Sequence, residues 1–301
     1  MCLHNAIKIF FIIFAYQNQP TKTFMTSISC THLIYFSPTH TSEKIARAIA
    51  EGIGMEKRIE TDLTIDESDR AIEIDNTLTI IAVPVYGGRI APIALQRFKR
   101  LHATSSPVIL VAVYGNRDYE DALVELYDAC STWGFTPLSA GAFIGEHSFS
   151  TEKRPIAHGR PDEKDLISAR KFGKESYEKL QALLKKEEQV TNKTSSKNIT
   201  DFLQGFHVKG HRPYKLLQPS RPSTPVSTSQ CFGCGECIPA CPTHAIVLNA
   251  ASDKIETDIH KCIRCCACVK ACPIHARVYT TPFAALLYEK CSLRREPELF
   301  F

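Results

Sequence analysis

The sequence predicts a two-part protein, in which an α/β domain with a doubly wound parallel sheet precedes a small α+β domain rich in cysteine. Three observations support this prediction. The chain has 301 residues, about twice the length of a typical domain. Its first two thirds alternate short apolar segments with amphipathic ones, the pattern of parallel strands covered by helices on both faces. Ten of its 13 cysteines lie between Cys231 and Cys291.

The apolar segments of the first part predict five strands, and the amphipathic segments between them predict the helices that connect parallel strands. The strands are expected at 32–36, 57–63, 78–83, 108–113 and 138–144. The helices are expected at 42–53, 91–101, 119–133 and 162–186. The last helix begins after Pro161, a common residue at a helix start.

Composition along the chain predicts the domain boundaries. Residues 191–198 are polar without an apolar period, and residues 219–229 are rich in proline and serine, so both are typical of connectors. We expect the following parts: an extension at 1–24, an α/β domain at 25–190, a linker at 191–228, a cysteine-rich domain at 229–281, and a C-terminal helix and tail at 282–301. A packed accessory segment and an export signal are the alternatives for the extension.

Charge and hydropathy exclude two classes of partner. The 36 basic and 32 acidic side chains leave a net charge of +4, and neither a basic helix nor an aromatic platform is present, so nucleic acid is not the expected partner. No run of 18 apolar residues is available to cross a bilayer, so we expect no stable membrane insertion.

The cysteines form two runs with the same spacing, C-x-x-C-x-x-C-x-x-x-C-P, offset by 31 residues. The first run is Cys231, Cys234, Cys237 and Cys241, and the second is Cys262, Cys265, Cys268 and Cys272. Three thiolates at this spacing wrap a loop around one corner of a four-iron cube. Paired zinc sites, the alternative, would need only C-x-x-C pairs. The repeat therefore predicts two 4Fe-4S clusters in a reducing compartment, which we expect to be the cytoplasm.

In the two-cluster ferredoxin arrangement the last cysteine of each run binds the other cluster. We therefore expect one cluster on Cys231, Cys234, Cys237 and Cys272, here named the Cys234 set. The other cluster is expected on Cys262, Cys265, Cys268 and Cys241, here named the Cys265 set. Cys266 is a ninth cysteine within the second run and is expected to be a packing residue.

A loop rich in hydroxyl groups lies between the first strand and the first helix. Its candidate residues are Ser37, Thr39, His40, Thr41 and Ser42. Free amides and the helix dipole favour an anion at a helix N-terminus, and the hydroxyls add donors, so a phosphate group fits this loop. An ordinary helix cap is the alternative.

Two further loops follow the third and fourth strands, at the same edge of the sheet. Their candidate residues are Tyr86, Gly87, Gly88, Tyr114, Gly115, Asn116 and Tyr119. Ligands of open α/β sheets bind at this edge, where glycines permit close backbone approach and tyrosines offer flat faces for a ring. With the phosphate loop they predict bound FMN, and tight turns with tyrosines in the core are the alternative.

With these motifs, residues 25–301 resemble the family of fused flavodoxin and ferredoxin proteins of anaerobic bacteria. The similarity includes PVYGGR (84–89), YGNRDYEDAL (114–123), FIGEHSFS (143–150), HGRPD (158–162) and CSLRREPELFF (291–301). One departure is His40, where similar proteins usually have glycine.

The resemblance implies a sheet of order 2-1-3-4-5, a ferredoxin domain, and electron transfer between two 4Fe-4S clusters and FMN with redox proteins as partners. We expect an electron carrier rather than a stand-alone enzyme, and no catalytic residue is predicted. Two alternatives stay open: a flavin-dependent reductase that uses the clusters as an internal wire, and an iron–sulfur protein whose α/β domain serves for docking or sensing without flavin.

Overall fold

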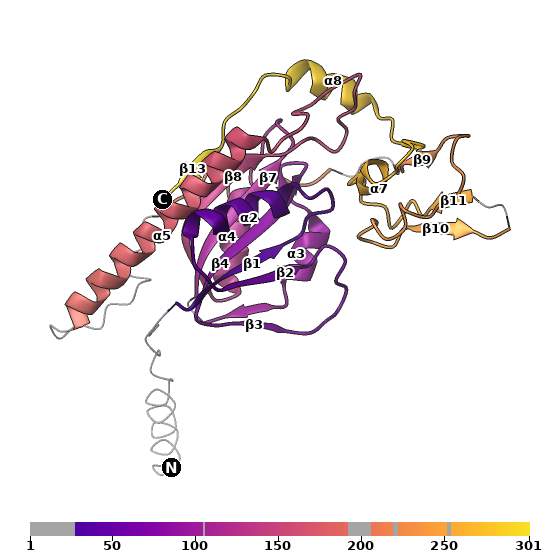
Figure 1. The fold of residues 1–301 in the computed structure, drawn as a ribbon. Helices are drawn as coiled ribbons and strands as arrows, with labels where there is room; N and C mark the ends of the chain where they lie inside the picture. The colour runs from indigo at the N-terminus through magenta and orange to yellow at the C-terminus, as the bar shows by residue number, and fades with distance from the viewer. Residues whose placement is uncertain (1–27, 105, 192–205, 219–221, 252–253) are drawn as a thin grey trace, which may run out of the picture.

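The computed structural model describes residues 28–104, 106–191, 206–218, 222–251 and 254–301 (Figure 1). The extension expected at 1–24 lies outside these ranges. So does much of the expected linker. No described helix is both long enough and apolar enough to cross a membrane.

Five parallel strands form the centre of the α/β domain. They are β1 (Cys30–Tyr35), β2 (Arg58–Asp62), β4 (Thr77–Tyr86), β7 (Ser106–Tyr114) and β8 (Phe135–Ile144). Their order in space is β2-β1-β4-β7-β8, and each pairs with its neighbour in parallel. The five predicted strands and the predicted order 2-1-3-4-5 are therefore confirmed, with ends that differ by a few residues.

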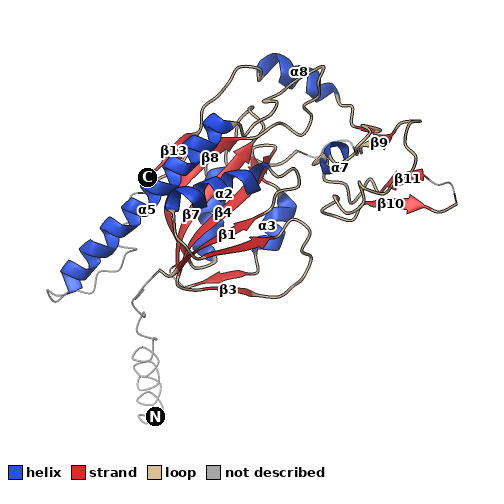
Figure 2. Ribbon diagram, viewed as in Figure 1, coloured by secondary structure: helices blue, strands red, loops and turns tan. Residues whose placement is uncertain are grey.

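Helices cover both faces of this sheet (Figure 2). Two of them, α2 (Thr41–Ile53) and α5 (Glu163–Thr191), share one core with Leu33 and Tyr35 of β1. The other two, α3 (Pro92–Phe98) and α4 (Ala122–Thr132), share a second core with Ile34 of the same strand. Alternate side chains of a strand point to opposite faces, so each central strand supplies both cores.

Helices α2 and α5 pack with their backbones in close contact. A Cβ placed on Gly52 would collide with the Arg170 carbonyl group, and one placed on Gly173 would collide with the Ile49 carbonyl group. Glycine at these positions permits the approach that carries the long α5 helix across the sheet.

One strand of the sheet comes from the far end of the chain. Strand β13 (Glu298–Phe300) pairs antiparallel with β8, whose ten residues are all buried. The sequence analysis expected only a tail here, because three residues carry no alternation of their own. An edge strand left unpaired would expose a row of amides and carbonyls, so this pairing covers the edge of β8.

Shorter strands surround the main sheet. Strand β5 (Arg89–Ile90) turns back on the end of β4, and β3 (Ile72–Ile74) pairs with β6 (Leu101–Ala103). The predicted helix at 91–101 therefore ends early, at Phe98, because Leu101 is used in a strand.

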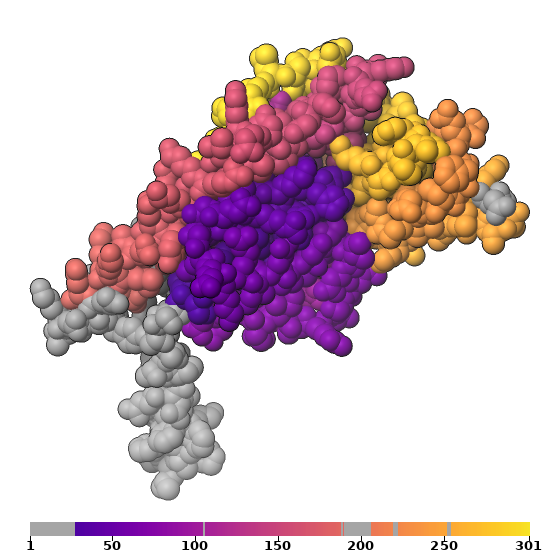
Figure 3. Space-filling model, in the orientation of Figure 1, coloured from indigo at the N-terminus to yellow at the C-terminus, as the bar shows by residue number. Residues whose placement is uncertain are grey.

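The described part of the cysteine-rich domain (residues 222–251 and 254–281) contains two small antiparallel strand pairs and one short helix. Strand β9 (Val226–Ser227) pairs with β12 (Arg277–Val278), and β10 (Ile246–Asn249) pairs with β11 (Lys254–Thr257). Helix α7 (Ala267–Lys270) lies within the second cysteine run and contains Cys268, and α8 (Pro282–Lys290) leads back towards the sheet. The domain packs against one end of the α/β domain and projects from it (Figure 3).

Residues 206–218, which belong to the expected linker, pack along α4. Phe206 joins the core on that face. The Asp128 carboxylate accepts hydrogen bonds from Arg212 and Tyr214, and the Asp121 carboxylate accepts from the backbone amides of His211 and Lys215. We name residues 206–218 the strap.

Candidate functional site

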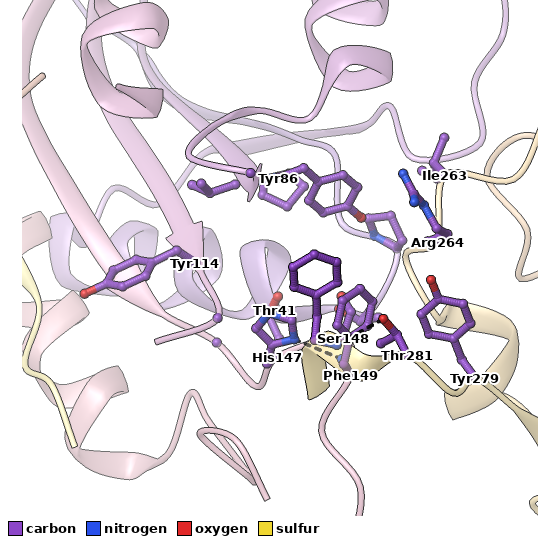
Figure 4. A pocket seen from close by; sticks show the side chains of 18 of the residues that line it. Thr41, Tyr86, Tyr114, His147, Ser148, Phe149, Ile263, Arg264, Tyr279 and Thr281 are labelled. Atoms are coloured by element: carbon purple, nitrogen blue, oxygen red, sulfur yellow. Dashed lines mark hydrogen bonds between the residues drawn. The ribbon is translucent and has the colours of Figure 1, made fainter. Parts of the chain in front are cut away.

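A cavity of about 1060 Å³ lies between the α/β domain and the cysteine-rich domain (Figure 4). The α/β domain contributes residues that follow the carboxyl ends of β1, β4, β7 and β8. The cysteine-rich domain and the start of α8 contribute the segments 262–264 and 279–283. The cavity thus occupies the edge at which the sequence analysis expected a ligand.

The hydroxyl-rich loop forms one wall of this cavity through Ser37, Thr39, Thr41 and Ser42. The Ser37 hydroxyl accepts a hydrogen bond of 3.1 Å from the Glu43 amide and so caps α2. The Ser42 hydroxyl is buried and has no hydrogen-bond partner among the described residues. The first amides of a helix also lack partners within the helix, so this wall presents unused donors that fit a phosphate group.

His40 does not line the cavity, although the sequence analysis placed it among the phosphate-binding residues. Its backbone has φ 62° and ψ 8°, the left-handed conformation that glycine adopts most easily. Its side chain is 73% exposed and its Nδ1 lies 2.7 Å from the Glu43 carboxylate. The imidazole therefore leaves the loop free, and the backbone follows the path that glycine would give it.

Only some residues of the two loops that follow β4 and β7 line the cavity. Tyr86, Gly87, Tyr114 and Gly115 line the cavity. Gly115 needs to be glycine because a Cβ there would collide with the His147 ring.

The other three residues of these loops lie away from the cavity. Gly88 faces the Glu120 side chain. The Asn116 amide donates hydrogen bonds of 2.6 and 2.8 Å to the carbonyls of Cys291 and Leu293. Tyr119 is fully buried, and its hydroxyl donates to Glu298 at 2.6 Å. Asn116 and Tyr119 hold the C-terminal tail, a role that no local pattern indicates, since their partners lie more than 170 positions away in the chain.

Several cavity residues were missed by the sequence analysis. The rings of Phe149 and Tyr279 lie 5.2 Å apart between centroids, and His147 lies 4.9 Å from Phe149. Burial lowers the pKa of His147 to about 4, with Arg117 and Lys270 adding to the effect, so its imidazole is neutral at pH 7. His147 and Phe149 lie in the segment FIGEHSFS, which carries part of the family resemblance, and no local sequence pattern indicates Tyr279 as a cavity residue.

The Cys265 set comes together in the structure. A small enclosed cavity is lined by Cys241, Cys262, Cys265 and Cys268, with Cys266 beside them. Cys241 comes from the first run, as the crossed arrangement requires. Burial raises the pKa of the Cys265 thiol to about 12, so a thiolate there needs a bound cation such as iron.

The Cys234 set is closer to the surface. Cys237 lies near Cys231 and Cys234. Of these three cysteines, Cys234 is exposed. Cys272 is buried, and its Sγ accepts a hydrogen bond of 3.2 Å from the Ala276 amide.

The same bond recurs in the other half of the repeat, where the Cys241 Sγ accepts from the Ala245 amide at 3.3 Å. Amides that donate to sulfur suit cluster ligands, because such bonds tune cluster potentials. Among the described residues, no three His, Cys, Asp or Glu side chains converge closely enough to hold a single metal ion. A four-iron cube differs from such a site because it spreads its thiolates over four iron atoms.

Comparisons with known proteins agree with this division. The family model of the 4Fe-4S dicluster domain matches residues 225–273. Among solved structures the chain is similar to a flavodoxin from the domain Archaea (12% identity, covering 50% of this chain and 99% of that chain, TM-score 0.33). It is also similar to a flavodoxin from Streptococcus pneumoniae (15% identity, covering 51% of this chain and 98% of that chain, TM-score 0.35). A flavodoxin from Fusobacterium nucleatum bound to flavin mononucleotide is similar as well (14% identity, covering 52% of this chain and 98% of that chain, TM-score 0.31).

No curated protein matches the sequence. The matched family model covers the cysteine-rich part of the chain, and the strand order describes the other part. The chain therefore joins an α/β domain with flavodoxin-like strand order to a 4Fe-4S dicluster domain.

Proposed function

We propose that the chain is an electron carrier in which two 4Fe-4S clusters exchange electrons with one bound FMN. The observation that carries the proposal is the shared cavity, since Ser42 of the phosphate loop and Cys262 of the Cys265 set both line it. Electron transfer needs the two redox groups close together, and a shared wall supplies that closeness. The partners would be redox proteins that give or take single electrons.

The residues have separate roles in this proposal. The hydroxyls of Thr39, Thr41 and Ser42, with the first amides of α2, would hold the phosphate of FMN. Tyr86 and Gly87 would contact its ring system. When bound, FMN supplies a group that accepts two electrons, whereas a cluster passes one at a time. The two cysteine sets would each hold one cluster.

The rest of the cavity would keep water from the flavin. Phe149 and Tyr279 form one aromatic contact there, and Phe283 lies in the lining beside them. A water-poor site strengthens the electrostatic effect of nearby charges on a redox group. Arg264 from the cysteine-rich domain supplies a positive charge to this lining, so it would favour the negative charge that reduction brings.

All twelve described cysteines are free, which supports a reducing compartment, and we propose the cytoplasm. Metal and flavin content after anaerobic purification and reconstitution tests the function directly. We expect about eight iron atoms and one FMN per chain. Iron without flavin would contradict the carrier and favour an iron–sulfur protein whose α/β domain serves for docking or sensing.

A second candidate is a reductase that acts on its own small organic substrate. The observation that favours it is the polar lining away from the phosphate loop, which includes Gln218, Ser223 and Thr281. A turnover assay with small organic acceptors, and without a protein acceptor, separates the two functions. Sustained turnover would favour the reductase, and a protein that only exchanges electrons with other proteins would favour the carrier.

A further inference from the structure

The two cysteine sets differ in their relation to the cavity. Cys262, Ile263 and Arg264 line it, whereas no described residue of the loop 231–241 does. Ile263 also packs against the core that contains α3 and α4. The loop of the second cysteine run therefore lines the cavity between the domains, and the loop 231–241 does not.

Tyr86 lies at the end of β4 and lines the cavity. Cys262, a member of the Cys265 set, lines the same cavity together with Ile263 and Arg264. The ring-binding wall and one cysteine of the second run therefore face the same space.

The Cys234 set differs in that one of its ligands is exposed to solvent. Cys234 is exposed, and the neighbouring Phe232 is 68% exposed, the largest exposed aromatic fraction among the described residues. Cys265 and Cys268 are each only 7% exposed. An exposed aromatic side chain beside an exposed cluster ligand is a surface on which another protein can bury apolar area close to a redox centre.

From these observations we infer an order for the two clusters, which rests on the proposed function. The cluster of the Cys265 set exchanges electrons with the flavin. The cluster of the Cys234 set is the port at which a second, one-electron redox protein docks, with Phe232 in the contact. Tunnelling rates fall steeply with distance, so each transfer uses the nearer pair of groups.

The electron count follows from this order. The partner loses one electron, which reduces the cluster of the Cys234 set, and that cluster passes it to the cluster of the Cys265 set. Two successive transfers, with protons taken from water, supply the two electrons that reduce the flavin. Under conditions that favour oxidation the same path runs in reverse.

The port is tested with Phe232→Glu in the full reconstituted chain. Stopped-flow absorbance follows reduction by two probes, a reduced two-cluster ferredoxin as the protein donor and the methyl viologen radical as the small donor. The matched control is Leu293→Glu, which introduces the same charge outside the cysteine-rich domain. Leu293 is 83% exposed and lies in the C-terminal tail. Iron content and the visible spectrum show that both variants keep their clusters.

We expect Phe232→Glu to slow reduction by the ferredoxin about tenfold while the rate with methyl viologen and both rates of the control stay within twofold. If the two variants change the rate of reduction by the ferredoxin equally, the proposed docking site at Phe232 is wrong. It is also wrong if methyl viologen reduces the native chain and the ferredoxin does not.

The order of the clusters has an independent readout, the fluorescence of bound FMN. A nearby cluster quenches the excited flavin, and quenching falls steeply with distance. Cys265→Ala and Cys234→Ala each remove a ligand from one set, and about four remaining irons per chain indicate that the other cluster is intact. We expect a several-fold rise in fluorescence for Cys265→Ala and little change for Cys234→Ala.

The reverse pattern, or equal rises in the two variants, would overturn the proposed order. The absence of bound FMN in the native chain would contradict the proposed function instead. The Phe232 experiment does not need flavin, because reduction of the clusters alone reports on the port. The two failures are therefore distinguishable.

Discussion

At the scale of single residues, His40 shows how backbone conformation can be kept while side-chain identity changes. It begins α2 in the left-handed region, and its imidazole points to solvent beside Glu43. A residue with a Cβ pays about 1–2 kcal/mol for that conformation. The sequence revealed the departure from glycine, but only the structure shows that the side chain leaves the loop open.

We therefore expect His40→Gly to stabilise the protein slightly and to leave flavin binding almost unchanged. Glycine removes the free-energy cost of the left-handed conformation, and this effect exceeds the cost of ordering the more flexible glycine on folding. We therefore expect the free energy of unfolding to rise by about 0.5–1 kcal/mol. Urea unfolding measures the first effect and FMN titration of the apoprotein measures the second. A gain in FMN affinity of tenfold or more would mean that the imidazole obstructs the phosphate.

Ser42 is the residue whose chemistry most directly supports phosphate binding. Its hydroxyl is buried, has no partner among the described residues and lies in the cavity wall. A hydrogen bond from a hydroxyl to a charged group contributes about 1.5–3 kcal/mol, so Ser42→Ala should weaken FMN binding at least tenfold. Riboflavin, which lacks the phosphate, is the control ligand and should bind both proteins equally. Equal losses for the two ligands would place Ser42 away from the phosphate.

At the scale of elements, the sequence predicted what depends on local pattern. Four of the five central strands, β1, β4, β7 and β8, contain apolar runs, and α2 and α4 are amphipathic, so local pattern revealed them. Strand β2, with the sequence RIETD, has a weaker pattern. Strand β13 and the strap were not predicted, because each is short and stabilised by distant partners. The strap relies on Asp121 and Asp128 of α4 and its N-terminal flank, about 90 positions earlier in the chain.

The strap should make stability depend on pH through Asp128. Hydrogen bonds from Arg212, helped by Tyr214 and opposed by burial, hold the pKa of this carboxyl below its usual 3.8. A carboxyl with a lowered pKa contributes stability above the pKa of the unfolded chain, and this contribution is lost as pH falls through the folded value.

Asp128→Asn should therefore lower the free energy of unfolding by about 1 kcal/mol at pH 7 and change it very little near pH 2. The loss at pH 7 is modest because the Arg212 side chain is 55% exposed. Fluorescence of Trp133, the one tryptophan of the chain, follows urea unfolding at the C-terminal end of α4. Glu152→Gln, at an exposed loop residue, is the control and should have no effect at either pH. A loss that stays constant from pH 7 to pH 2 would show that Asp128 does not act through its charge.

At the scale of the whole molecule, the packing of the two domains creates the site. Arg97 of α3, only 5% exposed, donates to the Pro242 carbonyl at 2.6 Å and also to the carbonyls of Leu63 and Thr64. Lys270 lies 3.0 Å from Glu146. The sequence predicted both domains and both ligand sets, yet it gave no sign that they share one cavity, because the residues that join them are common surface types with no spacing rule.

The Lys270 contact makes the packing of the domains testable by charge reversal. Lys270 approaches the Glu146 carboxylate, and although burial opposes ionisation, the lysine and the Gly159 amide hold the pKa of Glu146 below its usual value. Two carboxylates at this distance repel each other. Lys270→Glu should therefore loosen the cysteine-rich domain, enlarge the radius of gyration measured by small-angle X-ray scattering, and weaken FMN binding several-fold.

Lys261→Glu is the matched control for this reversal, because Lys261 is an exposed lysine of the same domain that does not line the cavity. It should change neither quantity. If Lys270→Glu also leaves the radius of gyration and FMN affinity unchanged, other contacts, such as those of Arg97 and Ile263, suffice to hold the domains together. If the radius grows while FMN affinity is kept, the α/β domain binds the flavin without the wall supplied by residues 262–264. The flavin site would then belong to one domain, and the cavity between the two would serve electron transfer alone.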